Sequence, residues 1–318
     1  MGNLVRVYYL QKECVRVDTT TVSSYAEVNE EGLLQLGYSK DHRPDLAQLK
    51  VVLACLDPLG MPLATEVLSG EQADDPAYLP IIARVREGLG KQGLLYVGDG
   101  KMAALQTRAS IQFHEDFYLC PLSSVQVLLD QLQQEFDRLR KKERQMTRVE
   151  RVNEKNKRIC IAQGYEMSQE LTTEVNGQTQ TWTERRLLIQ SMSAAEAAEH
   201  SLQERVKKAE QTLLHLLVRK QGKPHLKTRL EIDEAIREVM KKFRVEGFLD
   251  VVVQEESHER QIRAYRGKLS SPRQEVVFMI SSTRNEKALE YAISHLGWRV
   301  YATNQKTAYL TLEQAVEA

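Results

Sequence analysis

The sequence predicts an α/β protein in which a mixed β-sheet is flanked by helices and is interrupted by a large α+β insertion with a long basic helix. Three observations lead to this prediction. Short runs rich in Val, Leu and Thr alternate with segments whose apolar residues recur at helical spacing. The turn Pro58-Leu59-Gly60 joins two of those runs into an antiparallel hairpin. A densely basic stretch then separates the first strands from a last strand near residue 300.

The predicted elements of the first block follow one another as strand, antiparallel hairpin, helix, strand, helix and strand. Asp75-Pro76 begins the first helix, because proline is favoured at the first helical position, and apolar residues at 78, 81, 82, 85 and 89 continue it. This order is that of a ribonuclease-H-like core. The predicted strands span residues 14–22, 49–57, 62–68, 94–98 and 117–121, and the second helix spans Met102–Ala109.

We expect three parts along the chain: residues 1–123 form the first part of the core, 124–296 form an insertion domain, and 297–318 return to the core. Ser123 and Gln126 form a capping box that predicts a long helix to about Arg151. Turn and capping signals predict the other elements of the insertion. These are a hairpin around Asn176-Gly177, helices capped by Ser193, Thr228 and Thr283, and short strands near 248–253, 260–266 and 274–281.

The last part is predicted to be a strand, Trp298–Asn304, followed by a helix that Thr311 and Gln314 cap. The sequence stops in the second turn of this helix, without a Gly, a Pro or a polar tail. Natural helices seldom end in this way, so the sequence predicts a truncated product.

Positive charge is concentrated within an otherwise neutral chain. The chain has 44 basic and 44 acidic residues, but the stretch from Arg138 to Arg158 holds ten basic and three acidic ones. On the predicted helix, six of the cations fall at spacings of 3-4-3-4-3 and form one continuous face. Such a face is either solvated or packed in a coiled coil, or it binds the phosphates of a polyanion such as DNA. The six are Lys141, Arg144, Arg148, Arg151, Lys155 and Arg158.

Two aspartates come at the ends of apolar runs that are predicted to be neighbouring strands. Asp18 follows Val15-Arg16-Val17, and Asp99 follows Leu94–Gly98. Two carboxylates and a substrate phosphate suffice to hold Mg²⁺ (or Mn²⁺), which keeps several waters. Such a site supports in-line attack on a DNA phosphodiester. The alternative is that Asp99, which precedes Gly100-Lys101-Met102, is only a turn former or helix cap.

The segment 36–45 lies between the first strand and the hairpin, and we expect it near the two aspartates. Lys40, His42 and Arg43 give it three groups that bind phosphates, although a solvated loop has the same composition. The four cysteines show no metal-binding spacing, which favours free thiols. No signal peptide and no apolar run of about 18 residues is present, so we expect a soluble, intracellular protein without a membrane partner.

Six runs of the sequence carry a resemblance to a known family: Val17–Val22, Gly37–Asp45, Leu56–Ala64, Ser69–Asp75, Val97–Ala104 and Gly297–Asn304. They resemble bacterial insertion-sequence transposases of the DDE type. The resemblance implies that Asp18 and Asp99 are the first two catalytic carboxylates, that they bind Mg²⁺ (or Mn²⁺), and that the family cleaves and transfers DNA strands during transposition. It further implies that the partner is double-stranded DNA (transposon ends and target) and that active members of the family are homo-oligomers. The implied localisation is the bacterial cytoplasm, with association with the nucleoid when the protein binds DNA.

The chain departs from this family in its last carboxylate. The family carries a third carboxylate in a helix with a Tyr, Arg, Glu and Lys signature, shortly past the strand that Trp298–Asn304 resembles, and this sequence stops before it. We do not expect Glu313 or Glu317 to replace it. The resemblance therefore implies a truncated transposase fragment that binds DNA without transposing. The alternatives are a non-catalytic DNA-binding or oligomerising protein and a stand-alone nuclease.

Overall fold

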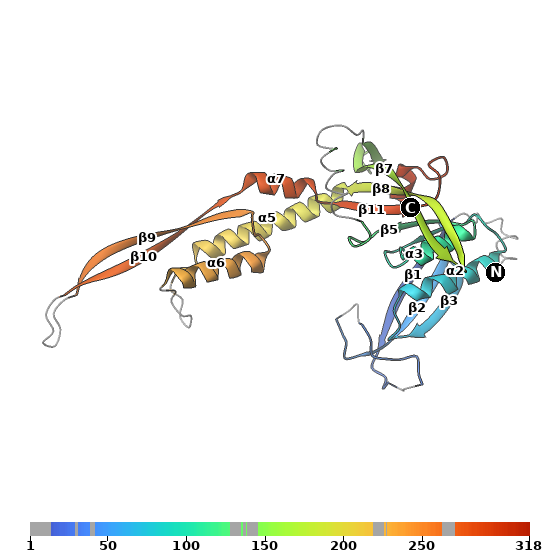
Figure 1. Ribbon diagram of the computed structural model, residues 1–318, viewed down its shortest axis with the longest axis horizontal. Helices are drawn as coiled ribbons and strands as arrows, with labels where there is room; N and C mark the ends of the chain where they lie inside the picture. Colours follow the sequence, from blue (N-terminus) through green and yellow to red (C-terminus); the bar gives the residue numbers. More distant parts are fainter. Residues whose placement is uncertain are drawn as a thin grey trace. The chain divides into compact units, whose positions relative to one another are not determined.

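A computed structural model describes residues 14–28, 31–38, 42–127, 135, 138, 146–218, 226, 228–262 and 271–318 (Figure 1). The chain forms two compact units. Unit 1 comprises Met1–Ser191 and Trp298–Ala318, and unit 2 comprises Met192–Gly297.

Unit 1 is built on a nine-stranded mixed sheet with the order β3-β2-β1-β4-β5-β11-β8-β7-β6. The pairs β1–β4 and β4–β5 are parallel, and the other pairs are antiparallel. The first five strands have the order and directions of a ribonuclease-H-like core, which confirms the predicted fold class. The strands are β1 (Cys14–Ser24), β2 (Ala47–Leu56), β3 (Met61–Ser69), β4 (Leu95–Gly98), β5 (Phe117–Pro121), β6 (Thr147–Val152), β7 (Arg158–Val175), β8 (Gln178–Ser191) and β11 (Trp298–Thr303).

The central strands alternate their side chains between two apolar cores. Tyr96 of β4 is buried in one core with Val15 and Val17 of β1, whereas Leu95 and Val97 pack into the other. Residues of α2 (Tyr78–Leu89, after the short helix η1, Asp75–Ala77) and of α3 (Leu105–Phe113) line the first core. Residues of α8 (Leu312–Glu317) line the second. Helices thus cover both faces of the sheet, and the alternation along β1 places Asp18 on the face that α8 covers.

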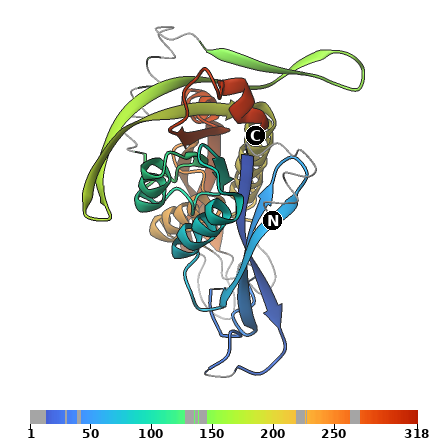
Figure 2. The same cartoon turned by 90° about the vertical axis from the view of Figure 1, so that its right-hand side faces the viewer.

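The return strand is confirmed, but the sheet extends further than expected. In β11, Ala302 pairs with Cys120 of β5 and with Arg186 of β8. The predicted hairpin around Asn176-Gly177 is confirmed as β7 and β8, which form a long curved ribbon (Figure 2). Because β8 is hydrogen-bonded to β11, the strands expected in the insertion belong to the core sheet. The break between the two units follows Ser191, not residue 123.

The prediction of a long basic helix to Arg151 is wrong at the C-terminal end of that helix, because residues 147–152 form strand β6. Val149 is the one buried residue of this strand, and it pairs with Ala162 of β7. Thr147, Val149 and Val152 are β-branched and favour an extended backbone. Of the earlier part of the predicted helix, most residues lie outside the described ranges.

Unit 2 is an α+β unit in which α5 (Met192–Leu214) and α6 (Arg229–Phe243) pack beside a two-stranded ribbon (Figure 1). The ribbon consists of β9 (Leu249–Ile262) and β10 (Ser271–Arg284), so the prediction of three short strands is wrong. Thr283 lies in β10, and Asn285 caps α7 (Glu286–Ser294) in its place. The capping box of Thr228 is confirmed, as is that of Thr311 in unit 1. No helix in the described part of the chain is long and apolar enough to cross a membrane.

Candidate active site

Asp18 and Asp99 lie at equivalent positions of two neighbouring parallel strands. The last paired residues of β1 and β4 are Val17 and Gly98, and each aspartate follows immediately. Adjacent strands are about 4.8 Å apart, so the two backbones are close here. Both aspartates are exposed. The sheet therefore places the two aspartates on adjacent strands, and their catalytic role stays a prediction.

Each carboxylate is held through one of its oxygens. The backbone N–H of Thr19 donates to Oδ1 of Asp18 at 2.8 Å, and the backbone N–H of Lys101 donates to Oδ1 of Asp99 at 2.9 Å. Within the described ranges, Oδ2 of neither aspartate accepts a hydrogen bond from the protein. Among the described residues, no hydrogen bond therefore occupies the second oxygen of either carboxylate.

Tyr78, in the first turn of α2, is a residue of the site that the sequence did not indicate. Its hydroxyl donates to Oδ1 of Asp99 at 2.5 Å, and its side chain is buried completely. Burial first, and then the hydrogen bond to Asp99, raises the pKa of the Tyr78 phenol, so the hydroxyl is protonated at neutral pH. The charge of Asp18 is the smallest of the causes that raise this pKa.

The loop that carries Asp99 packs closely against Met102 and is held by hydrogen bonds to the backbone at Ala103. A Cβ on Gly98 would lie 2.7 Å from Sδ and 3.1 Å from Cβ of Met102, so a larger residue at this position would have to displace the Met102 side chain. The carbonyl oxygen of Ala103 accepts hydrogen bonds from Nε of Arg108 at 2.9 Å and from Nε2 of Gln126 at 2.6 Å. These contacts fix the backbone that places Asp99 beside β1.

The site offers suitable but incomplete ligands for divalent cations. Two exposed carboxylates with available oxygens suit Mg²⁺ or Mn²⁺, which take oxygen ligands and keep several waters. Among the residues that the structure describes, no group of three or more His, Cys, Asp and Glu side chains is arranged to hold a metal ion. One ion between Asp18 and Asp99 therefore fits the residues present, whereas a second ion would need further ligands.

The segment around Arg43 lies away from the two aspartates, contrary to expectation. Asp18 pairs with Leu53, and the β1–β2 hairpin continues for six more residues to the pair Ser24–Ala47. At about 3.3 Å per residue this is roughly 20 Å. Arg43 lies beyond that end and forms an ion pair with Asp45 at 2.7 Å. His42 lies beside it, Lys40 is outside the described residues, and their contact with DNA stays a prediction.

The predicted basic face is replaced by a basic hairpin at the edge of the sheet. Arg148 and Arg151 lie on β6, Lys155 lies in the turn, and Arg158 begins β7. The turn also carries Lys157, an exposed cation that does not fall on the helical spacing of the six predicted ones. Lys141 and Arg144 lie outside the described residues. The cations gather because β6 turns back on β7, not because they share a helix face.

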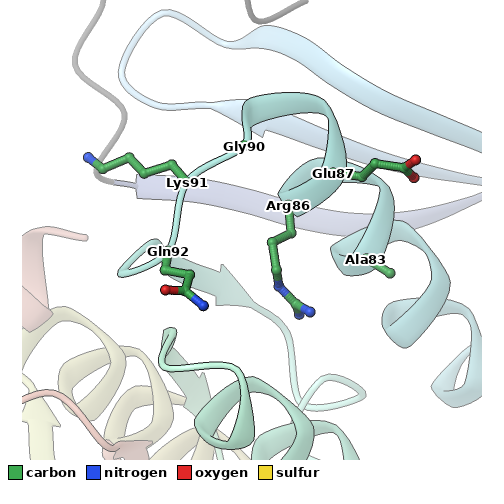
Figure 3. Close-up of a pocket in the computed structure, with 6 residues that line it drawn as sticks. All are labelled: Ala83, Arg86, Glu87, Gly90, Lys91 and Gln92. Atoms are coloured by element: carbon green, nitrogen blue, oxygen red, sulfur yellow. The ribbon is translucent and has the colours of Figure 1, made fainter.

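A shallow hollow of about 420 Å³ lies at the end of α2 and has no part in the aspartate site (Figure 3). Arg86, Gly90 and Lys91 are among the residues that line it. Arg86 is engaged by Asp116, with Nε 3.1 Å from Oδ2. The hollow is at the C-terminal end of α2, whereas Tyr78 and Asp99 meet at its N-terminal end.

Comparison with known proteins gives partial structural likenesses. No protein-family model matches the chain, and no curated protein matches it. A piggyBac transposase synaptic complex with hairpin DNA shares 7% identity, with a TM-score of 0.27, over 55% of this chain and 30% of that one. A variant of endonuclease V from Ciona intestinalis, in complex with a 23mer DNA containing an inosine, shares 10% identity, with a TM-score of 0.23, over 47% of this chain and 64% of that one. The same endonuclease with a 24mer DNA gives 11% identity and a TM-score of 0.21, over the same shares of the two chains. The chain therefore spans less than two thirds of each of these proteins.

Proposed function

We propose that unit 1 carries the first two carboxylates of a DDE-type transposase, a class that cleaves and transfers DNA strands with Mg²⁺ or Mn²⁺. The observation that carries this proposal is the position of Asp18 and Asp99, which directly follow Val17 and Gly98, the last residues that pair β1 with β4 in a ribonuclease-H-like sheet. The sequence runs that resemble this family include both aspartates. Neither aspartate caps a helix, since α3 begins only at Leu105, although Asp99 does form a turn in which its Oδ1 accepts from the N–H of Lys101.

The residues of the site have distinct roles in the proposed phosphoryl transfer. A divalent ion supplies charge neutralisation at the scissile phosphate and lowers the pKa of an attacking water or hydroxyl. Asp18 and Asp99 would hold that ion through the oxygens that accept no hydrogen bond from the described residues. The N–H groups of Thr19 and Lys101 keep each carboxylate in a fixed orientation. A substrate phosphate and waters would complete the coordination.

Mn²⁺ binding to the full chain tests the site directly, because it requires no turnover. We expect Asp18→Asn and Asp99→Asn each to abolish high-affinity Mn²⁺ binding, measured by electron paramagnetic resonance, and to abolish any Mn²⁺-dependent nicking of supercoiled plasmid. Glu313→Gln and Glu317→Gln are the matched controls: both residues are exposed on α8, which packs on the face of the sheet that bears Asp18, and both variants should bind like the parent. Unchanged binding in both aspartate variants would refute the proposal.

A second candidate function, DNA binding without catalysis, is favoured by the basic β6–β7 hairpin. Arg151, Lys155, Lys157 and Arg158 are all exposed there. Cations on a projecting two-stranded turn can follow a phosphate backbone, and each phosphate contact adds about 0.9 to the dependence of log K on log salt. This function would remain if the aspartates proved inert.

A charge-matched pair of variants tests the hairpin. Lys155→Gln/Lys157→Gln should weaken binding to duplex DNA and lower the salt slope by about 0.9 for each lost contact, measured by fluorescence anisotropy at several salt concentrations. Lys207→Gln/Lys208→Gln removes the same charge from exposed positions of α5 and should change neither quantity. Equal effects of the two double variants would show that net charge, not the hairpin, determines binding.

A further inference from the structure

The short helix η1 and the first turn of α2 are attached to the loop that carries Asp99 by one contact each. Tyr78 donates to Oδ1 of Asp99 at 2.5 Å, and Nζ of Lys101 lies 3.5 Å from Oδ1 of Asp75. The Lys101–Asp75 pair is about half exposed and contributes little by itself. The Tyr78 bond is different, because the phenol is completely buried and cannot exchange its acceptor for water.

From these contacts we infer that Tyr78 is a positioning residue, which fixes the orientation of Asp99 so that its Oδ2 is presented to a divalent cation. The inference rests on the proposed function of Asp18 and Asp99. Oδ1 of Asp99 accepts two hydrogen bonds, from Tyr78 and from the N–H of Lys101, and is thereby occupied. A carboxylate held at one oxygen cannot rotate freely, so its other oxygen keeps a single direction. Partners of this kind raise metal affinity because the ligand is ordered before the ion arrives.

A buried tyrosine does not need such a partner to be stable in this fold. Tyr96 of β4 is equally buried in the same core, and its hydroxyl has no hydrogen-bond partner within the described part of the chain. The two tyrosines therefore differ in their hydroxyl contacts and not in their burial. That difference provides an internal control, since Tyr→Phe removes a buried hydroxyl in both cases and touches Asp99 in only one.

The test is Mn²⁺ titration of four variants of the full chain, followed by electron paramagnetic resonance: Tyr78→Phe, Tyr96→Phe, Asp18→Asn and Asp99→Asn. We expect Tyr78→Phe to raise the apparent Kd for Mn²⁺ by about 10-fold to 100-fold, the usual effect of losing a residue that orients a metal ligand. Tyr96→Phe should leave this Kd unchanged. Where nicking is measurable, Tyr78→Phe should require more Mn²⁺ for half-maximal rate and should recover the parent rate at saturating Mn²⁺.

The outcomes separate the role of Tyr78 from the existence of the site. If both aspartate variants lose binding and Tyr78→Phe binds like the parent, the positioning role is refuted and the two-carboxylate site stands. If the aspartate variants bind like the parent, the site is refuted, and the positioning role with it. If Tyr78→Phe and Tyr96→Phe weaken binding equally, the effect is a general loosening of the core, which also refutes the role. Circular dichroism on each variant establishes that the folded chain is compared.

Discussion

Arg108 of α3 and Glu184 of β8 form an ion pair that is almost completely removed from solvent, with 5% and 0% of their side chains exposed. Glu184 also accepts a hydrogen bond from the Tyr118 hydroxyl at 2.7 Å. Because Nε of Arg108 binds the carbonyl oxygen of Ala103, the pair connects the Asp99 loop to the far part of the sheet. A buried charge that loses its partner is costly, so this connection is important for stability.

The first prediction concerns this ion pair. Arg108→Met should lower the free energy of unfolding by about 3–5 kcal/mol, because it leaves the Glu184 carboxylate buried with weaker compensation. Arg43→Met is the control: its pair with Asp45 is 45% and 60% exposed, and the change should be below about 1 kcal/mol. Urea denaturation followed by circular dichroism measures both. Equal losses would contradict the importance of the buried pair.

The second prediction concerns Gly70, which follows β3. A Cβ there would lie 2.0 Å from the backbone oxygen of Gln48 and 2.7 Å from that of Gln35, so Gly70→Ala forces the backbones apart. We expect a loss of about 1–3 kcal/mol in the free energy of unfolding.

Gly88 provides the opposite case, because a Cβ on this exposed residue of α2 meets nothing within 4 Å. Gly88→Ala should increase the free energy of unfolding by about 0.4–1 kcal/mol. Thermal and urea unfolding of the two variants measures the difference. A stable Gly70→Ala protein would show that the close approach at Gly70 is not required.

The third prediction concerns Cys120, a completely buried thiol of β5. Burial raises its pKa to about 12, so at pH 8 only about one thiol in 10⁴ is ionised. Iodoacetamide should therefore leave Cys120 unmodified in the folded chain and modify it after unfolding in urea, as peptide mass spectrometry can establish. Rapid modification under native conditions would mean that β5 is open to solvent.

The fourth prediction concerns metal and stability together. A ligand that binds only the folded state adds about 2.7 kcal/mol to the free energy of unfolding at a concentration 100-fold above its Kd. Mn²⁺ should accordingly raise the melting temperature of the parent protein, and chelation by EDTA should reverse the rise. Asp99→Asn should show no rise. An equal rise in this variant would place the bound ion elsewhere.

The sequence predicts the part of the fold in which local signals agree with long-range pairing. Asp75-Pro76 and the apolar spacing after it predict α2, and Asn176-Gly177 predicts the turn between β7 and β8. Both elements are defined by residues close together in the chain. Asp18 and Asp99 could be placed on neighbouring strands because each directly follows an apolar run of a recognisable core.

The remaining features depend on contacts that a linear pattern does not contain. The cations from Lys141 to Arg158 fit a helical spacing equally well, and only pairing with β7 makes residues 147–152 a strand. Tyr78 looks like any apolar residue of an amphipathic helix, and its role is visible only because its hydroxyl reaches Asp99 in the folded chain. Segment 36–45 was expected near Asp18, but it follows the far end of β1, which is six residues beyond Asp18.

The central position of β11 has a consequence for how the protein folds during its synthesis. This strand, Trp298–Thr303, lies between β5 and β8, yet all of unit 2 precedes it in the chain. Until β11 leaves the ribosome, β5 and β8 each have one edge without a paired strand. Unpaired strand edges invite association with other chains. Pairing over such long sequence separations is also slow. Closure of the sheet is therefore a late folding event, and β5 and β8 are the edges at which a chaperone would protect the nascent protein.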